Sequence, residues 1–94
     1  MKTIIVFTKN RCPQCGDLKQ RLNNLSIPFK NIEVTLNREL WNQVVNQTGY
    51  DVLPTVFIQE PNNSSGLVYT PGRDFQDIDE IIEILKKEYI EKRV

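Results

Sequence analysis

A short apolar run that leads into a helix beginning with proline constrains the fold of this chain most. Residues 4–7 (Ile-Ile-Val-Phe) are β-branched or aromatic, which is typical of a buried strand. Pro13 suits the first turn of a helix, where its missing N–H costs nothing. Leucines then recur at the i, i+4 and i+7 positions of one helical face: Leu18, Leu22 and Leu25. Pro28 disfavours helical backbone at the residue before it. The pattern therefore predicts a strand followed by a helix over residues 13–25.

The rest of the chain alternates short apolar runs with helical spacing. We expect a strand over residues 29–34, a helix over 38–47 that stops before Gly49, and strands over 55–58 and 67–70. With a last helix added, the predicted order is β-α-β-α-β-β-α. A strand–helix–strand unit forms a right-handed parallel pair, and the two later strands form a hairpin. The sequence therefore predicts an α/β fold with a four-stranded mixed sheet flanked by helices.

A last helix is predicted from Asp74 towards Lys92. Asp74 is expected to cap it, and three further acidic residues lie near the positive end of its dipole: Asp77, Asp79 and Glu80. Its apolar side is formed by Ile78, Ile81, Ile82, Leu85 and Tyr89. Residues 59–66 are turn-forming and predict a long hairpin loop. Trp41 has helical spacing within the second helix, so we interpret it as a packing residue.

Length and charge limit the classes of function. Ninety-four residues fit one domain over residues 1–94, and a hydrophobic share of 39% is ordinary for a globular chain. Twelve cations balance twelve anions, so no overall charge indicates a nucleic-acid or membrane partner. The halves differ, because residues 1–47 contain seven cations and three anions, a net charge of +4. These cations crowd around the cysteines, where they either favour a thiolate and an anionic ligand or form a plain solvated face.

Two cysteines and no histidine narrow the chemistry further. No apolar run is long enough for a secretory signal or a bilayer span, so we expect a cytoplasmic protein. We also expect a monomer. Two cysteines in such a chain are more often redox-active or metal-binding than structural. The lack of histidine excludes Ser–His and Cys–His catalysis, His-ligated zinc and haem attachment.

Cys12 and Cys15 are the candidate catalytic residues. Cys12 falls at the predicted start of the first helix, where unpaired N–H groups and the helix dipole favour negative charge. Cys-x-x-Cys motifs at such positions lower the thiol pKa, and Lys9 and Arg11 add positive charge. Cys15 lies one turn further along the leucine face, so we expect it to be the more buried thiol. Cys12 is therefore the predicted nucleophile, and Cys15 the thiol that resolves a mixed disulfide.

A metal site is the rival interpretation of the pair. One Cys-x-x-Cys supplies half of a tetrahedral zinc site, and the chain has neither a second pair nor a histidine. Zinc or an iron–sulfur cluster would need a second chain or an outside thiol as ligand. We therefore expect no bound metal, and an iron–sulfur or zinc carrier that dimerises through Cys12 remains the alternative from another class.

Three stretches of the sequence resemble the glutaredoxins of the thioredoxin-like superfamily: residues 8–15, 48–58 and 72–74. The resemblance implies the thioredoxin-like fold, and it implies that Cys12 takes the sulfur of a glutathione mixed disulfide. It also implies that Pro54 is a cis-proline and that the main chain of Leu53 pairs with glutathione like a short added strand.

Further glutathione contacts follow from the same resemblance. Lys9 falls on the family's lysine near the glycine carboxylate of glutathione, and Gln14 lies between the cysteines where the family usually has an aromatic residue. Arg73 and Asp74 fall where backbone N–H groups at the last helix hold the γ-glutamyl end. Asp51 stands where the family often has Arg or Gln, and an anion there would repel the glycine carboxylate.

We predict a glutathione-dependent thiol–disulfide oxidoreductase that reduces protein disulfides or glutathione mixed disulfides through the Cys-Pro-Gln-Cys dithiol. Glutathione is the expected electron donor, no cofactor is expected to stay bound, and the expected roles are electron transport and cell redox homeostasis. Gln14 is also similar to its counterpart in redoxins that supply electrons to ribonucleotide reductase and are recharged by thioredoxin reductase. That electron route is the alternative within the enzyme class.

Overall fold

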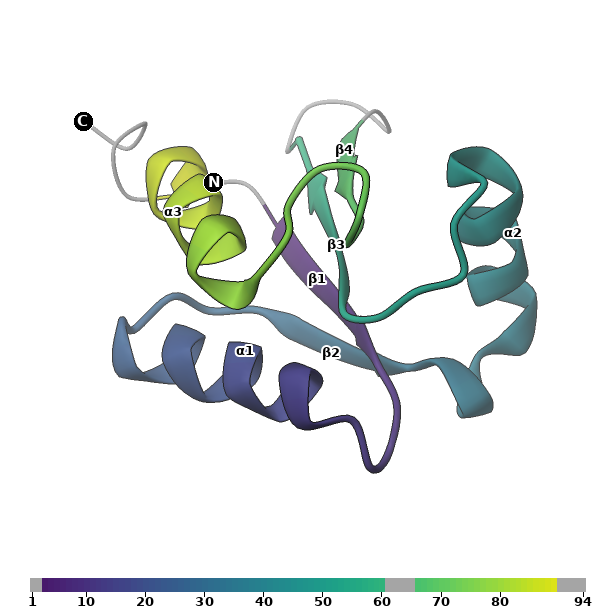
Figure 1. Ribbon diagram of the computed structural model, residues 1–94, viewed down its shortest axis with the longest axis horizontal. Coiled ribbons are helices and arrows are strands. Elements are labelled where there is room, and N and C mark those ends of the chain that lie inside the picture. The colour runs from purple at the N-terminus through teal and green to yellow at the C-terminus, as the bar shows by residue number, and fades with distance from the viewer. Residues whose placement is uncertain (1–2, 61–65, 90–94) are drawn as a thin grey trace.

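The computed structural model describes residues 3–60 and 66–89, and Figure 1 shows their arrangement. Within these residues the elements are, in chain order, β1 (Thr3–Thr8), α1 (Pro13–Asn24), β2 (Lys30–Glu33), the 3-10 turn η1 (Val34–Leu36), α2 (Arg38–Thr48), β3 (Thr55–Gln59), β4 (Gly66–Tyr69) and α3 (Ile78–Tyr89). The boundaries of the first two helices and of the strands agree with the sequence prediction to within one or two residues. Gly49 ends α2 in the left-handed conformation (φ 78°), which confirms the predicted stop.

The sheet has the order β2-β1-β3-β4 within the described residues. β1 pairs with β2 in parallel, as a strand–helix–strand unit requires, and it pairs with β3 antiparallel. β3 and β4 form the antiparallel hairpin. The predicted mixed sheet is therefore confirmed, and β1, which leads to the cysteines, is one of its two central strands.

Helices cover both faces of the sheet. Successive side chains of β1 point to opposite sides, so each face has apolar side chains that a helix can bury. Ile4 and Val6 are buried with apolar side chains of α1 and α3, whereas Phe7 belongs to a second buried cluster with α2. Figure 1 shows α1 and α3 on one side of the sheet and α2 on the other. Leu22 is fully buried, as its spacing predicts, but Leu25 is 38% exposed because it lies beyond the last turn of α1.

The prediction that Asp74 caps the last helix is wrong. α3 begins at Ile78, and Asp77 caps it, because its carboxylate accepts the N–H of Glu80 at 2.9 Å. The Glu80 carboxylate in turn accepts the N–H of Gln76, the residue before the cap, at 2.9 Å. Asp74 instead accepts the N–H of Thr70 at 2.9 Å, so it closes the loop before the helix.

Two predicted features fall on residues that the structure does not describe. The long hairpin loop includes residues 61–65, and the predicted end of the last helix includes residues 90–92; both lie outside the described residues. None of the helices in the described part is long and apolar enough to cross a bilayer.

Candidate active site

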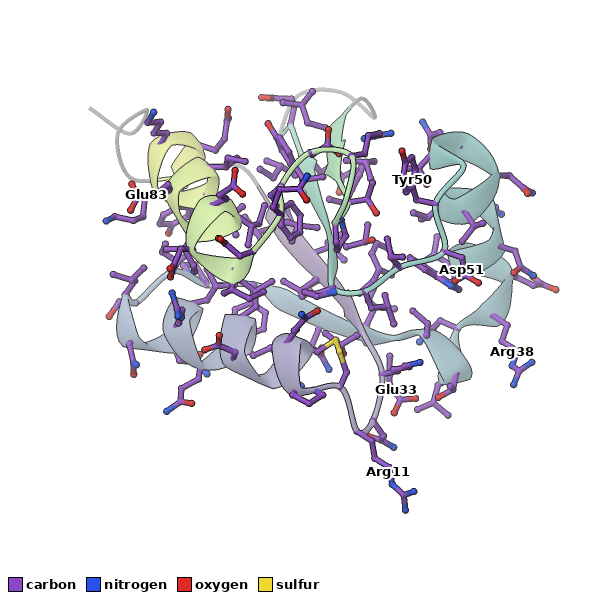
Figure 2. The ribbon with its side chains drawn as sticks, in the orientation of Figure 1. Arg11, Glu33, Arg38, Tyr50, Asp51 and Glu83 are labelled. Carbon is purple, nitrogen blue, oxygen red and sulfur yellow. A yellow bond between two sulfur atoms is a disulfide. The ribbon has the colours of Figure 1, made fainter. Side chains whose placement is uncertain are left out.

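The two cysteines occupy the junction between β1 and α1. Cys12 is the N-cap of α1, and its sulfur accepts the backbone N–H of Cys15 at 3.2 Å. The two sulfurs are joined in a disulfide across a Cα–Cα distance of 5.2 Å, seen as the yellow bond in Figure 2. Cys12 is half-buried, whereas Cys15 is 1% exposed, which confirms the expected difference in burial. An external thiol would therefore meet the sulfur of Cys12 first.

Positive charge surrounds one side of this disulfide. A pocket of about 520 Å³ is lined by Lys9, Asn10, Arg11, Cys12, Pro13, Cys15, Gly16 and Lys19. Within the described part of the chain its three cations form no ion pair with a carboxylate, and no carboxylate lines the pocket. Arg11 points outward from the turn between β1 and α1 (Figure 2). This pocket can attract an anionic group to Cys12.

A second pocket, of about 300 Å³, opens beside Pro54. It is lined by Gln14, Asp17, Arg21, Pro54, Pro71, Phe75, Gln76, Asp77, Ile78 and Asp79. Arg21 of α1 forms ion pairs with Asp17 and with Asp79 of α3, and hydrogen bonds to Asp79 and then Asp17 raise the pKa of its guanidinium. Two sides of the cysteine motif thus differ in charge, with cations around one pocket and mainly carboxylates around the other.

The loop that precedes β3 lies next to this second pocket. The Leu53–Pro54 peptide bond is cis, as the resemblance implies, and Pro54 is buried. Leu53 is half-buried, and its side chain packs against the cluster that contains Phe7 and Trp41. Among the described residues, neither the N–H nor the C=O of Leu53 has a hydrogen-bond partner. These two groups are free to pair with an extended main chain.

Arg73 and Asp74 are placed differently from what the resemblance implies. They lie in the loop between β4 and α3, four or more residues before the helix begins, and they line neither pocket. Their backbone N–H groups both donate to the C=O of Thr70, at 3.3 and 2.9 Å. The Arg73 guanidinium donates to Asp74 and to the C=O of Val68. In the structure, the backbone N–H groups of these two residues therefore lie in the loop before α3 and not at the end of the helix.

The structure adds one contact that the sequence analysis missed. The indole Nε1–H of Trp41 donates to Oδ1 of Asp51 at 3.0 Å. Trp41 is 8% exposed, which confirms it as a packing residue, but its polar edge reaches the loop before Pro54. Sequence spacing placed Trp41 on α2 and Asp51 in a turn, and no local pattern pairs two residues ten positions apart.

The six predicted glutathione contacts thus divide into three groups. Lys9 shares the pocket of the two cysteines, and Gln14 shares the second pocket with Pro54, to which Leu53 is joined. Arg73 and Asp74 lie outside both pockets.

Within the described residues no group of three or more potential ligands (His, Cys, Asp or Glu) is placed to hold a metal ion.

Comparisons with known proteins agree with this geometry. The model of the glutaredoxin family matches residues 4–60. A glutaredoxin from Vernicia fordii is 39% identical over 59 residues, which cover 60% of this chain and 57% of that protein. An N-acetyl-S-hydroxy-L-cysteine reductase from Bacillus subtilis (strain 168) is 31% identical over 64 residues, which cover 68% of this chain and 69% of that protein.

The fold has solved counterparts as well. The glutaredoxin-like NrdH-redoxin from Escherichia coli has a TM-score of 0.61 at 24% identity, over 87% of this chain and 93% of that chain. This structural similarity shows that the two chains share the thioredoxin-like fold. The family match covers more than half of the sequence and includes the strand, the cysteine motif and the cis-proline loop. The chain belongs to the glutaredoxin family of thiol–disulfide oxidoreductases, and Cys12 and Cys15 are its cysteine pair.

Proposed function

We propose that this chain reduces glutathione mixed disulfides and protein disulfides, with Cys12 as the nucleophile and Cys15 as the resolving thiol. One observation carries the proposal: the half-buried sulfur of Cys12 caps α1, with the buried sulfur of Cys15 within bonding distance behind it. A helix N-terminus stabilises a thiolate, and the cations of the adjacent pocket act in the same direction. The place of Cys12 at the N-terminus of α1 therefore favours its thiolate, which is the reactive form.

The reaction follows from thiol–disulfide exchange. The Cys12 thiolate attacks the glutathione sulfur of a mixed disulfide, the substrate thiolate leaves and takes a proton from solvent, and Cys12 carries the glutathione. A second glutathione thiolate then attacks the bound glutathione sulfur, which releases glutathione disulfide and restores the Cys12 thiolate. With a protein disulfide, the Cys15 thiolate attacks Cys12 after the first exchange and releases the reduced substrate. That route ends in the Cys12–Cys15 disulfide, the state in which the pair is found.

Substrate binding in this proposal uses both sides of the motif. Lys9 offers a cation for the glycine carboxylate of glutathione, and the unpaired N–H and C=O of Leu53 offer two main-chain hydrogen bonds. The negative charge of Asp51 repels the glycine carboxylate of glutathione, although one oxygen of Asp51 accepts a hydrogen bond from Trp41. Glutathione is accordingly expected to bind through Lys9 and the Leu53 main chain.

Single substitutions test the assignment of the two thiols. In a coupled assay with glutathione and its reductase, Cys15→Ser should still reduce a glutathionylated peptide, because only Cys12 and glutathione are required for that route. Cys12→Ser should fall to the background rate. If Cys12→Ser retained activity, or if Cys15→Ser alone abolished it, the nucleophile would be assigned to the wrong sulfur.

A second electron route has support from the loop before α3. The N–H groups of Arg73 and Asp74, which the resemblance assigns to the γ-glutamyl end of glutathione, donate to Thr70 instead. This arrangement weakens the case for glutathione and favours recharging by thioredoxin reductase, with a protein such as ribonucleotide reductase as the acceptor. Supplying the oxidised protein with either glutathione and its reductase or thioredoxin reductase, each with NADPH, separates the two donors.

A further inference from the structure

The loop that contains Leu53 is hydrogen-bonded to Trp41 through Asp51. We propose that Trp41 is a positioning residue, whose indole N–H fixes Asp51 and thereby keeps the main chain of Leu53 in place for an incoming substrate. The proposal rests on the proposed function, because it concerns how the same site receives a peptide-like disulfide. It assigns a role to a side chain that touches neither the sulfurs nor the substrate.

Trp41 connects the cysteine strand with the substrate loop. Its ring lies 5.6 Å from that of Phe7, centroid to centroid, with the two planes inclined at 40°. Phe7 belongs to β1, which leads directly into the turn that carries Cys12. On its polar edge, Trp41 donates to Oδ1 of Asp51 at 3.0 Å. Asp51, labelled in Figure 2, lies in the segment between α2 and β3. One buried indole thus contacts the strand behind the nucleophile and the loop beside it.

Three successive residues of the loop are held by side chains. Thr48 accepts the N–H of Tyr50 at 3.1 Å, and Thr55 donates to the C=O of Val52 at 2.7 Å. These two bonds join residues two or three positions apart and so shape the loop locally. The bond from Trp41 to Asp51 spans a larger separation, ten residues, and its donor belongs to a buried cluster.

Leu53 itself is oriented by the same cluster. Its side chain packs against the group formed by Phe7, Val34, Trp41 and Val44, while its N–H and C=O have no partner among the described residues. The side chain therefore points inward and leaves the two polar groups of the main chain for a ligand. A main chain that is already held in the binding conformation loses less conformational entropy when a substrate strand pairs with it.

Removing the indole N–H should lower kcat/KM only for substrates that pair with the Leu53 main chain. Trp41→Phe keeps an aromatic ring against Phe7 and lacks the donor, and Asp51→Ala lacks the acceptor. Trp41→Phe should lower kcat/KM for a glutathionylated peptide by roughly fivefold to tenfold, the size of effect typical of one hydrogen bond. Asp51→Ala should lower it by a similar factor relative to Asp51→Asn, which also lacks the negative charge. Reduction of bis(2-hydroxyethyl) disulfide by the reduced dithiol form should change less than about twofold, since that probe has no main chain to pair.

Three comparisons separate positioning from other effects. The double variant Trp41→Phe/Asp51→Ala should be no worse than either single variant, because the two side chains act through one bond. Asp51→Asn keeps the acceptor oxygen without the charge and should retain at least the kcat/KM of the unsubstituted protein. Glu39→Ala, which removes an exposed carboxylate from α2, is the matched control for loss of charge. Additive losses, a loss in Asp51→Asn, or an equal loss with the small disulfide would each overturn the proposal.

A measurement without substrate keeps this test independent of the proposed function. The ¹⁵N relaxation order parameter of the Leu53 amide should be near 0.85 in the unsubstituted protein and should fall below about 0.6 in Trp41→Phe, with the α1 amides unchanged. An order parameter that does not change would overturn the positioning role. Failure of the unsubstituted protein to reduce the glutathionylated peptide would instead defeat the proposed function and leave the relaxation result to decide the role of Trp41.

Discussion

At the scale of single residues, Cys12 combines two roles in one atom. Helix N-caps are usually oxygens of Ser, Thr, Asp or Asn, but here a sulfur accepts the N–H of Cys15. A thiolate at this position is a stronger acceptor than a disulfide sulfur, because charge-assisted hydrogen bonds are the stronger ones. Reduction of the pair should therefore strengthen the cap at the moment when Cys12 becomes reactive.

The cations around Cys12 should control how readily it is alkylated. With Cys15→Ser as background, reduced Cys12 should react with iodoacetamide at about pH 6 faster than a free cysteine does, because the thiolate is the reacting species. Lys19→Glu should slow this reaction severalfold by reversing a charge that lines the cysteine pocket. Lys30→Glu makes the same change on β2, away from both pockets, and serves as the control. Equal slowing by the two variants would contradict a local effect of Lys19.

At the scale of elements, the site depends on where α1 and α3 begin. α1 has Cys12 as its cap, and α3 has Asp77 as its cap, three residues later than the Asp74 that the sequence predicted. Both starts face the second pocket, where Arg21 of α1 pairs with Asp17 of its own helix and joins α1 to α3 through Asp79. These ion pairs are exposed, so they add little stability, and the apolar contacts between the helices hold the arrangement.

The cap of α3 offers a direct test of the corrected helix start. Asp77→Ala should lower the free energy of unfolding by about 1 kcal/mol, measured by urea denaturation, because the N–H of Glu80 loses its acceptor. Asp77→Asn should stay within about 0.5 kcal/mol of the unsubstituted protein, since Asn caps nearly as well as Asp. If Asp77→Ala had no effect, the bond from Glu80 would contribute nothing to the start of α3.

At the scale of the whole molecule, a charge difference along the chain becomes a difference in space. The excess of cations in residues 1–47 supplies the three that line the pocket of the cysteines. The acidic residues at the start of α3 instead line the pocket beside Pro54. A disulfide that approaches Cys12 therefore meets opposite charges on the two sides of the motif, which can orient it before it reacts.

This arrangement predicts charge selectivity that depends on salt. At low ionic strength, the reduced protein should reduce the dianionic 3,3′-dithiodipropionate faster than the dicationic cystamine, when each rate is divided by that of dithiothreitol with the same probe. The difference should shrink severalfold between about 10 mM and 1 M salt, because the screening length falls from about 30 to 3 Å. Neutral bis(2-hydroxyethyl) disulfide is the control and should not respond to salt. A preference that persists at high salt would point to shape instead of charge.

Local sequence determined most of the elements and the identity of the cysteine pair. A β-branched run, a proline at the first helical turn and a leucine spacing act over a few residues, so β1, α1 and the capping position of Cys12 could be predicted directly. Gly49 acts equally locally, since the left-handed backbone that ends α2 is easiest for glycine. The burial of Cys15 followed from the same helical spacing.

Only the tertiary structure decided which residues meet around those cysteines. Asp74 and Asp77 are both acidic and both precede the apolar face of α3, and the hydrogen bond of Asp74 to Thr70 leaves Asp77 to begin the helix. Trp41 and Asp51 pair because the sheet brings α2 against the loop before Pro54. Such contacts depend on how separate elements pack, and packing is a property of the folded chain, which local propensity does not contain.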